Sequence, residues 1–166
     1  MLQMSDARQL LVYELGAALT MEETSVTMLR ELSETTDAGE LREQLWHHRD
    51  ETRGQIGNIT RAFAALGYEP KPRPCPTIEG FKTERELLIQ HTAPELHATV
   101  ILGGCVAVEH YEIAVYEGLI TLAEELELDD ISVLLKENLE QEEHTLEEVE
   151  KAFERQAKTL VERVPA

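Results

Sequence analysis

Aromatic residues and cysteines are scarce in this sequence. Aromatic side chains make up 5% of the 166 residues, whereas hydrophobic residues as a whole reach 42%, so aliphatic side chains must supply the core. The two cysteines, Cys75 and Cys105, are far apart and form no CxxC pair. This spacing argues against a thiol redox motif and against a disulfide framework. We therefore expect two reduced thiols in a cytoplasmic protein.

Basic residues are also few. The 15 Lys and Arg residues stand against 33 Asp and Glu residues, which gives a formal net charge of −18. Nucleic acids and anionic membrane surfaces both attract clustered Lys and Arg. No stretch approaches the roughly 20 apolar residues of a membrane span, and the N-terminal MLQMSDARQ lacks the basic and apolar regions of a signal peptide. The composition predicts no nucleic-acid partner and no membrane association.

Glutamate accounts for most of the acidic residues. Glu is a strong helix former, whereas Asp is a poor one, so the balance of acids favours an all-α protein. A chain of this length has room for one domain with one sizeable core. We therefore treat residues 1–166 as a single domain.

Hydrophobic residues recur at spacings of three and four in four long segments, which predicts four long helices. Residues 68–76, YEPKPRPCP, hold four of the six prolines and cannot be helical. A short helix over about residues 78–91 follows them. Two antiparallel helical hairpins joined by a long crossover with a short extra helix form a ferritin-like four-helix bundle. The long helices are expected over about residues 5–33, 39–66, 92–126 and from 129 or 130 onward.

The ends of these helices carry local signals. Gly67 is suited to end the second helix, because glycine adopts the left-handed conformation that often follows a helix. Ser, Thr and Asp side chains accept hydrogen bonds from the first free amides of a helix. The expected N-terminal caps are Ser5 and Asp6, Thr36 or Asp37, Thr77, Thr92 in a capping box with Glu95, and Asp129 or Asp130.

Each of the four long helices places a glutamate on or beside its apolar face. An unpaired buried carboxylate costs several kcal/mol, so such residues need a cationic partner. A Glu from each helix of a bundle is how a di-iron or di-manganese carboxylate site is built, with imidazole as an occasional further ligand. The candidate metal ligands are Glu22, Glu51, Glu109, Glu112 and Glu142, together with His48 and Gln55 on the same helix as Glu51.

Several of these residues have simpler interpretations. On the second helix the periodicity allows either Glu51 or Thr52 to face inward. His48 is as readily a core or ligand-orienting histidine as a ligand, and Gln55 is better suited to hydrogen-bond a ligand than to bind metal itself. A single Glu in an apolar stripe often means that the boundary of the predicted helix is misplaced. Four such residues on four helices at similar depth favour a site.

Two specific strings stand out, the motif His48-x-x-Glu51-Thr-x-Gly-Gln55 and VEHYEIAVY over residues 108–116. The first is similar to the second-helix motif of the YciE/YciF-type ferritin-like family, and the second is nearly the third-helix signature of that family. Cys75 followed by Glu79-Gly80 resembles its crossover, and Glu22 and Glu142 stand where that family has acids. The resemblance implies a di-metal (iron or manganese) carboxylate protein associated with stress. It also implies a homodimer.

The sequence departs from the family pattern at three positions. Leu146 stands where the family usually has an acid four residues after the inward Glu142, and Gln141 replaces another acid of that run. Thr24 stands where the first-helix motif usually has Gln. From its place in the apolar stripe we expect Leu146 to be a core residue. Loss of a carboxylate there would leave one of the two metal positions weak or empty.

Two functions are compatible with this pattern. The first is a di-metal protein that handles oxygen, peroxide or the metal itself, for which the sequence identifies no substrate and does not establish an enzyme. The second is a non-enzymatic helical bundle that acts by oligomerisation or partner binding and holds a vestigial or structural metal site. Leu146 is the residue that favours the second function.

Overall fold

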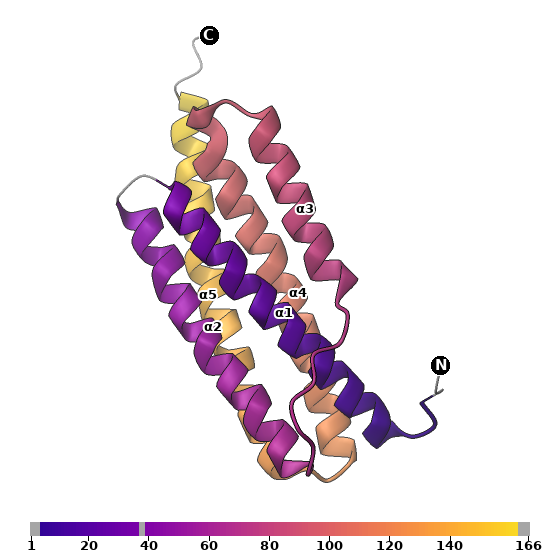
Figure 1. The fold of residues 1–166 in the computed structure, drawn as a ribbon. Helices are drawn as coiled ribbons and strands as arrows, with labels where there is room; N and C mark the ends of the chain where they lie inside the picture. The colour runs from indigo at the N-terminus through magenta and orange to yellow at the C-terminus, as the bar shows by residue number, and fades with distance from the viewer. Residues whose placement is uncertain (1–3, 37–38, 163–166) are drawn as a thin grey trace.

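Four long helices form an antiparallel bundle, and a fifth helix lies along its outside (Figure 1). The structure is a computed structural model that describes residues 4–36 and 39–162. The elements are α1 (Ala7–Thr35), α2 (Glu40–Ala65), α3 (Pro76–His91), the 3₁₀ turn η1 (Pro94–Leu96), α4 (His97–Glu125) and α5 (Asp129–Glu162).

The helices pair as two hairpins. α1 packs along α2, and α4 packs along α5 (Figure 1). The crossover between them contains α3, which lies beside α4 and also contacts α1. The expected all-α, ferritin-like bundle with one long crossover and a short extra helix is therefore confirmed.

The extended part of the crossover is attached to α1 at Gly16. The backbone amide of Arg73 donates a hydrogen bond of 2.8 Å to the Gly16 carbonyl. A Cβ atom on residue 16 would lie 2.6 Å from the carbonyl oxygen of Lys71. Only glycine allows this close approach of two backbones.

Some of the expected helix ends are confirmed. The Asp6 side chain caps α1 by accepting a 2.8 Å hydrogen bond from the amide of Gln9. Gly67 follows α2 with φ 78°, in the left-handed region. Asp129 and Asp130, in contrast, are the first two residues inside α5 and not the residue that caps it.

Other expected caps are wrong. Thr92 ends α3 instead of starting a capping box, and its hydroxyl donates to the Leu88 carbonyl. The turn η1 intervenes, so α4 begins only at His97. Thr77 lies inside the first turn of α3, whose N-cap is Cys75. The residue that ends α1 is Thr36, while α2 is capped by Gly39. Asp37 lies outside the described residues.

Two apolar clusters fill the bundle, and a layer of buried polar residues separates them. The larger cluster includes Leu15 and Phe63, and the smaller includes Leu29 and Leu45. Each long helix passes from one cluster to the other and contributes polar side chains in between. This polar layer consists of Glu22, Ser25, His48, Thr52, Gln55, Asn58, Glu109, Glu112, Asn138, Glu142 and Thr145.

The most apolar of the helical segments is the one that contains α4. By length and composition alone, Pro94–Glu125 could cross a membrane, with a mean hydropathy of 1.4 over its most apolar window. The sequence analysis expected no such segment. This helix also carries Glu109 and Glu112 into the polar layer between the two clusters, and 28% of its most apolar window is buried.

Candidate metal centre

Four glutamates and one histidine from all four long helices meet in the polar layer. Glu22, Glu109, Glu112 and Glu142 are each at most 1% exposed, and His48 is 6% exposed. One ligand atom from each of His48, Glu109, Glu112 and Glu142 lies within 4.8 Å of the others. These residues therefore agree with the expectation from the sequence that glutamates from different helices lie at the same level of the bundle.

Glu22 lies at the edge of this group. The negative charges of Glu112 and Glu142 raise the pKa of its carboxyl, after the larger effect of burial. The Tyr116 hydroxyl donates a hydrogen bond to Glu22 Oε1. Glu22 thus extends the four-residue group toward the larger apolar cluster, where Tyr116 is buried.

Most of the ligand atoms in this site have no hydrogen-bond partner within the described residues. They are Oε2 of Glu22, both carboxylate oxygens of Glu109 and of Glu142, both ring nitrogens of His48 and Oε1 of Gln55. Buried polar atoms in folded proteins are almost always satisfied, and each exception requires an explanation. This concentration of buried oxygen and nitrogen atoms without partners indicates a cationic ligand that accepts lone pairs from several side chains.

Burial raises the pKa values of the carboxyl groups in this centre. It raises the pKa of Glu112 to about 7, although the hydrogen bond from Ser25 opposes the shift. The pKa values of Glu109 and Glu142 are also raised well above the usual range, first by burial and then by the charge of Glu112. Burial lowers the pKa of His48 to about 4, so its imidazole is neutral at physiological pH and has a lone pair to offer.

Hydrogen bonds from neighbouring polar residues orient the carboxylates. Ser25 Oγ donates to Glu112 Oε1 at 2.6 Å. The Tyr116 hydroxyl, which donates to Glu22, accepts a 2.9 Å hydrogen bond from Asn138 Nδ2. Asn138 Oδ1 in turn accepts one of 2.7 Å from Asn58 Nδ2. The sequence analysis missed Ser25, Asn58 and Asn138. A signal was present, because each lies on the buried phase of its helix next to a predicted ligand or core residue.

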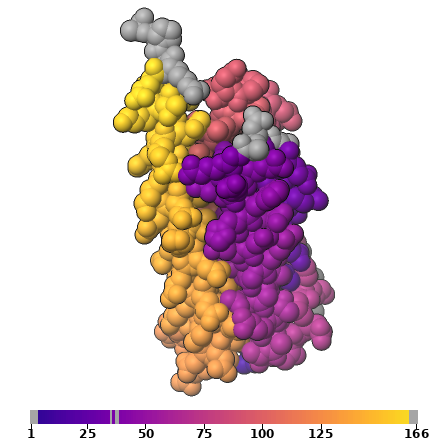
Figure 2. Space-filling model, turned by 90° about the vertical axis from the view of Figure 1, so that its left-hand side faces the viewer, coloured from indigo at the N-terminus to yellow at the C-terminus, as the bar shows by residue number. Residues whose placement is uncertain are grey.

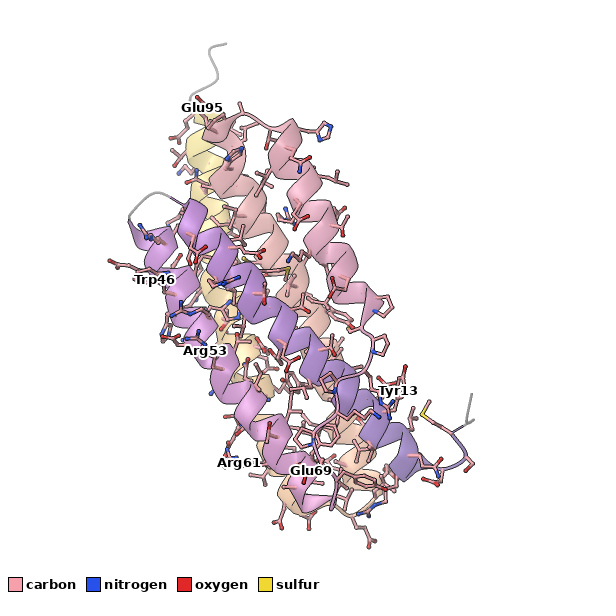
Figure 3. All side chains as sticks on the ribbon, viewed as in Figure 1. Tyr13, Trp46, Arg53, Arg61, Glu69 and Glu95 are labelled. Atoms are coloured by element: carbon pink, nitrogen blue, oxygen red, sulfur yellow. The ribbon has the colours of Figure 1, made fainter. Side chains whose placement is uncertain are left out.

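The position of Glu51 differs from the expectation. The inward residue of α2 at this level is Thr52, which is 1% exposed, whereas the Glu51 side chain is 25% exposed and lies 3.5 Å from His47 Nε2. Figure 3 shows Trp46, Arg53 and Arg61 pointing outward from the same helix. Glu51 therefore occupies the flank between the inner and outer faces, outside the group of converging carboxylates. Gln55 is buried as expected.

Leu146 is also not where the sequence analysis placed it. The buried residue of α5 beyond Glu142 is Thr145, and Leu146 is only partly buried. His144 points away from the site, as expected, with its Nε2 3.7 Å from Glu148. Position 146 therefore lies outside the polar layer, which α5 enters with Thr145. The absence of an acid at position 146 does not reduce the number of carboxylates in the layer.

Carboxylate oxygens with one or two imidazoles suit hard and borderline divalent cations such as Fe and Mn. The residues present fit such a group, because lone pairs outnumber hydrogen-bond donors and the histidine is neutral. His48 Nε2 lies 3.5 Å from Glu109 Oε1 and 4.0 Å from Glu142 Oε2. These atoms are close enough to share one ion.

The fold and this arrangement of carboxylates define a ferritin-like helical bundle with a candidate metal centre. Protein YciF of Escherichia coli (strain K12) is 30% identical over 146 residues, which covers 87% of this chain and 88% of that protein. A family model described as Domain of unknown function (DUF892) matches residues 6–162, and the chain belongs to this family. The resemblance to YciF-type ferritin-like proteins is thereby confirmed.

Solved structures show the same fold. The E. coli stress protein YciF matches with a TM-score of 0.87 at 28% identity, over 93% of this chain and 99% of that one. YcfI from Rhodopseudomonas palustris matches with a TM-score of 0.85 at 31% identity, over 88% and 94%. A structure of ferritin-like, diiron-carboxylate proteins from Bacillus anthracis str. Ames shares the fold at 17% identity, with a TM-score of 0.70 over 90% and 99%.

Proposed function

We propose that this protein is a di-metal carboxylate protein that binds two divalent ions, iron or manganese, inside its helical bundle. The observation that carries the proposal is the convergence of His48, Glu109, Glu112 and Glu142 in the buried layer, where the lone pairs outnumber the hydrogen-bond donors around them. A structural bundle would gain stability by replacing these groups with apolar side chains, because buried unpaired carboxylates are costly.

The side chains divide naturally between two ion positions. His48, Glu109, Glu112 and Glu142 converge on one position. Glu22, whose carboxyl senses the charges of Glu112 and Glu142, would complete a second position with these shared carboxylates. One oxygen of Glu22 is engaged by Tyr116, so this residue would bind through Oε2. Gln55 is buried in the same layer, and its Oε1 has no hydrogen-bond partner within the described residues.

The bound ions would supply redox chemistry with dioxygen or peroxide. Around them the protein provides a water-poor pocket, a neutral imidazole from His48 and hydroxyl donors from Ser25 and Tyr116 that hold two carboxylates in place. A role in stress responses is part of the proposal, because the relative from E. coli is described as a stress protein. Handling of oxygen, peroxide or the metal would each serve such a role.

Metal analysis of protein purified without chelator tests the proposal. We expect about two equivalents of Fe or Mn per chain after anaerobic reconstitution, in line with the ligand count of di-metal bundles. A chain that binds no metal after reconstitution would instead favour the alternative of a partner-binding bundle with a vestigial site.

The variant Glu142→Gln makes the test sharper, because it removes a ligand charge while keeping the shape of the side chain. Metal content should fall. At neutral pH the metal-free variant should melt at a higher temperature than the metal-free wild type, because a glutamine can be buried without the proton uptake that the raised pKa of Glu142 requires on folding. Glu117→Gln, an exposed position on α4, is the matched control and should change neither quantity. Retention of both metals in Glu142→Gln would show that this glutamate is not a ligand.

A further inference from the structure

A pocket opens in the seam between α2 and α5, beside the candidate metal centre. It has a volume of about 30 Å³ and reaches inward to His48. Polar side chains that line it include Gln44, His47, Glu51 and Glu148. Figure 2 shows the face on which α2 and α5 lie side by side along their length. The pocket therefore brings the surface of this seam to the side chain of His48, which belongs to the polar layer.

The polar residues of the pocket become more buried from the outside inward. The His47 side chain is 69% exposed and the Glu51 side chain is 25% exposed. Glu148 on the opposite helix is half exposed, whereas His48 is almost fully buried. Two carboxylates thus stand at the mouth, one from each helix, and an imidazole stands at the inner end.

His48 belongs to both the pocket and the metal centre. It lines the pocket, and its Nε2 lies 3.5 Å from Glu109 Oε1 in the centre. Neither ring nitrogen has a hydrogen-bond partner within the described residues. The rest of the pocket lining includes apolar residues such as Leu45, Leu102 and Val149, so the two carboxylates and this imidazole are among its groups suited to a cation. A buried, unpartnered imidazole in that place is suited to take an ion from the pocket side and pass it to the centre.

The opposite side of the bundle offers a less suitable route for a cation. A second cavity of about 30 Å³ also reaches His48 and Glu109, between α1, α3 and α4. The Arg85 guanidinium lines it and donates a hydrogen bond to the Val100 carbonyl. A fixed positive charge there repels divalent cations, so charge alone favours the seam between α2 and α5.

We propose that the pocket lined by Glu51, Glu148 and His48 is the entrance through which divalent cations reach the buried centre. The inference rests on the proposed metal-binding function. It gives Glu51 a transient role at the mouth, in place of the permanent ligand role expected from the sequence. Charged clefts of this kind raise the local concentration of counter-ions and increase association rates, and the effect weakens with ionic strength.

Stopped-flow loading of the metal-free protein with Co(II) tests this entrance, because Co(II) absorbs in the visible range when it binds protein ligands. The test variant is Glu51→Gln with Glu148→Gln. The control is Glu43→Gln with Glu143→Gln, which removes the same charge from exposed positions on the same two helices. We expect the test variant to load about tenfold more slowly and to reach the same final stoichiometry as wild type. The control should load at the wild-type rate.

Two further measurements strengthen the comparison. Raising the salt concentration should slow wild-type loading more than it slows loading of the test variant. Glu148→Lys, which places a positive charge at the mouth, should slow loading further than Glu148→Gln.

The outcomes separate this inference from the proposed function. A test variant that loads as fast as wild type would overturn the entrance while leaving the metal centre intact. A test variant with a lower final stoichiometry would overturn it in another way, because Glu51 or Glu148 would then be a ligand. If wild type and control bind no Co(II) at all, the proposed function itself fails, and the entrance fails with it.

Discussion

The hydroxyl of Tyr116 donates a hydrogen bond to the carboxylate of Glu22 inside the bundle, where both side chains are fully buried. The same hydroxyl accepts from Asn138 Nδ2, and Asn138 Oδ1 accepts from Asn58. Arg61, at the surface, donates to Asn58 Oδ1. Every bond in this chain points the same way, from the surface to Glu22. The phenolic proton is therefore directed at Oε1 of Glu22, which leaves Oε2 free for metal.

Tyr116→Phe is expected to change both stability and metal coordination. Without the hydroxyl, Asn138 loses an acceptor and Glu22 loses a donor, and leaving buried polar groups unsatisfied costs roughly 1–3 kcal/mol. Thermal melting in chelator should show this loss. In the Co(II)-loaded protein the visible spectrum should also change, because Glu22 can then bind through both oxygens. Tyr111→Phe, which alters a half-buried hydroxyl beside Cys75, is the control and should leave the spectrum unchanged.

The metal-free protein should lose stability as the pH rises. In the folded protein the pKa of Glu112 is about 7, compared with an ordinary value of 4.5. Between these values the folded state holds a proton that the unfolded state releases, so stability falls with increasing pH. The contribution is fully present below the ordinary pKa and is lost as the pH rises through about 7. The raised pKa values of Glu22, Glu109 and Glu142 act in the same direction. The lowered pKa of His48, about 4 compared with an ordinary 6.5, acts in the opposite direction between those two values, so the loss of stability is clearest above 6.5.

Melting in chelator from pH 6.5, the ordinary pKa of histidine, up to about pH 8 checks this expectation, because His48 no longer opposes the trend there. High salt serves as a control, because it screens repulsion between surface charges but not between buried ones. With Mn(II) present the trend should reverse, since metal ligands must be deprotonated. A metal-free melting temperature that increases with pH in high salt would contradict the prediction.

We also propose that the protein is a homodimer in solution. Leu87 and Leu88 on α3 are 51% and 41% exposed, so neighbouring apolar side chains remain available on the crossover helix for a second copy. Phe81, in contrast, packs against the core and the Tyr111 ring. Sedimentation at micromolar concentration should give twice the mass of one chain. Leu87→Glu with Leu88→Glu should shift the protein to monomer, whereas Val133→Glu on α5, also at an exposed apolar position, should not.

The architecture was predictable because each long helix repeats its apolar residues with the helical period and the prolines mark the crossover. The inward positions of Glu22, Glu109, Glu112 and Glu142 followed from the same periodicity. Each of these four glutamates lies within an apolar stripe. A shift of one residue along the helix would therefore have turned that stripe away from the core.

The helical pattern left the choice between Glu51 and Thr52 open and placed Leu146 on the buried face, and both have one physical reason. Adjacent residues on a helix are about 100° apart around the helix axis. Because buried residues recur at spacings of three or four residues, either of two adjacent residues can occupy the inward position. On α2 the stripe from His48 to Gln55 can pass through Glu51 or Thr52, and on α5 it can pass through Thr145 or Leu146. Packing against the other helices decides between them, and that depends on contacts between distant parts of the chain.

The choice between Thr145 and Leu146 gives the last prediction. Thr145 is buried in the polar layer, one turn from Glu142, whereas Leu146 is partly exposed on the flank of α5. An aspartate at position 145 would add a carboxylate to the layer, where without metal it costs several kcal/mol. Thr145→Asp should therefore melt well below wild type in chelator and should be raised by Mn(II) more than wild type is, because binding to the folded state adds stability. Leu146→Asp should lose less stability in chelator and respond to Mn(II) as wild type does. If Leu146→Asp were the variant rescued by metal, position 146 would belong to the centre, and the register of α5 described above would be wrong.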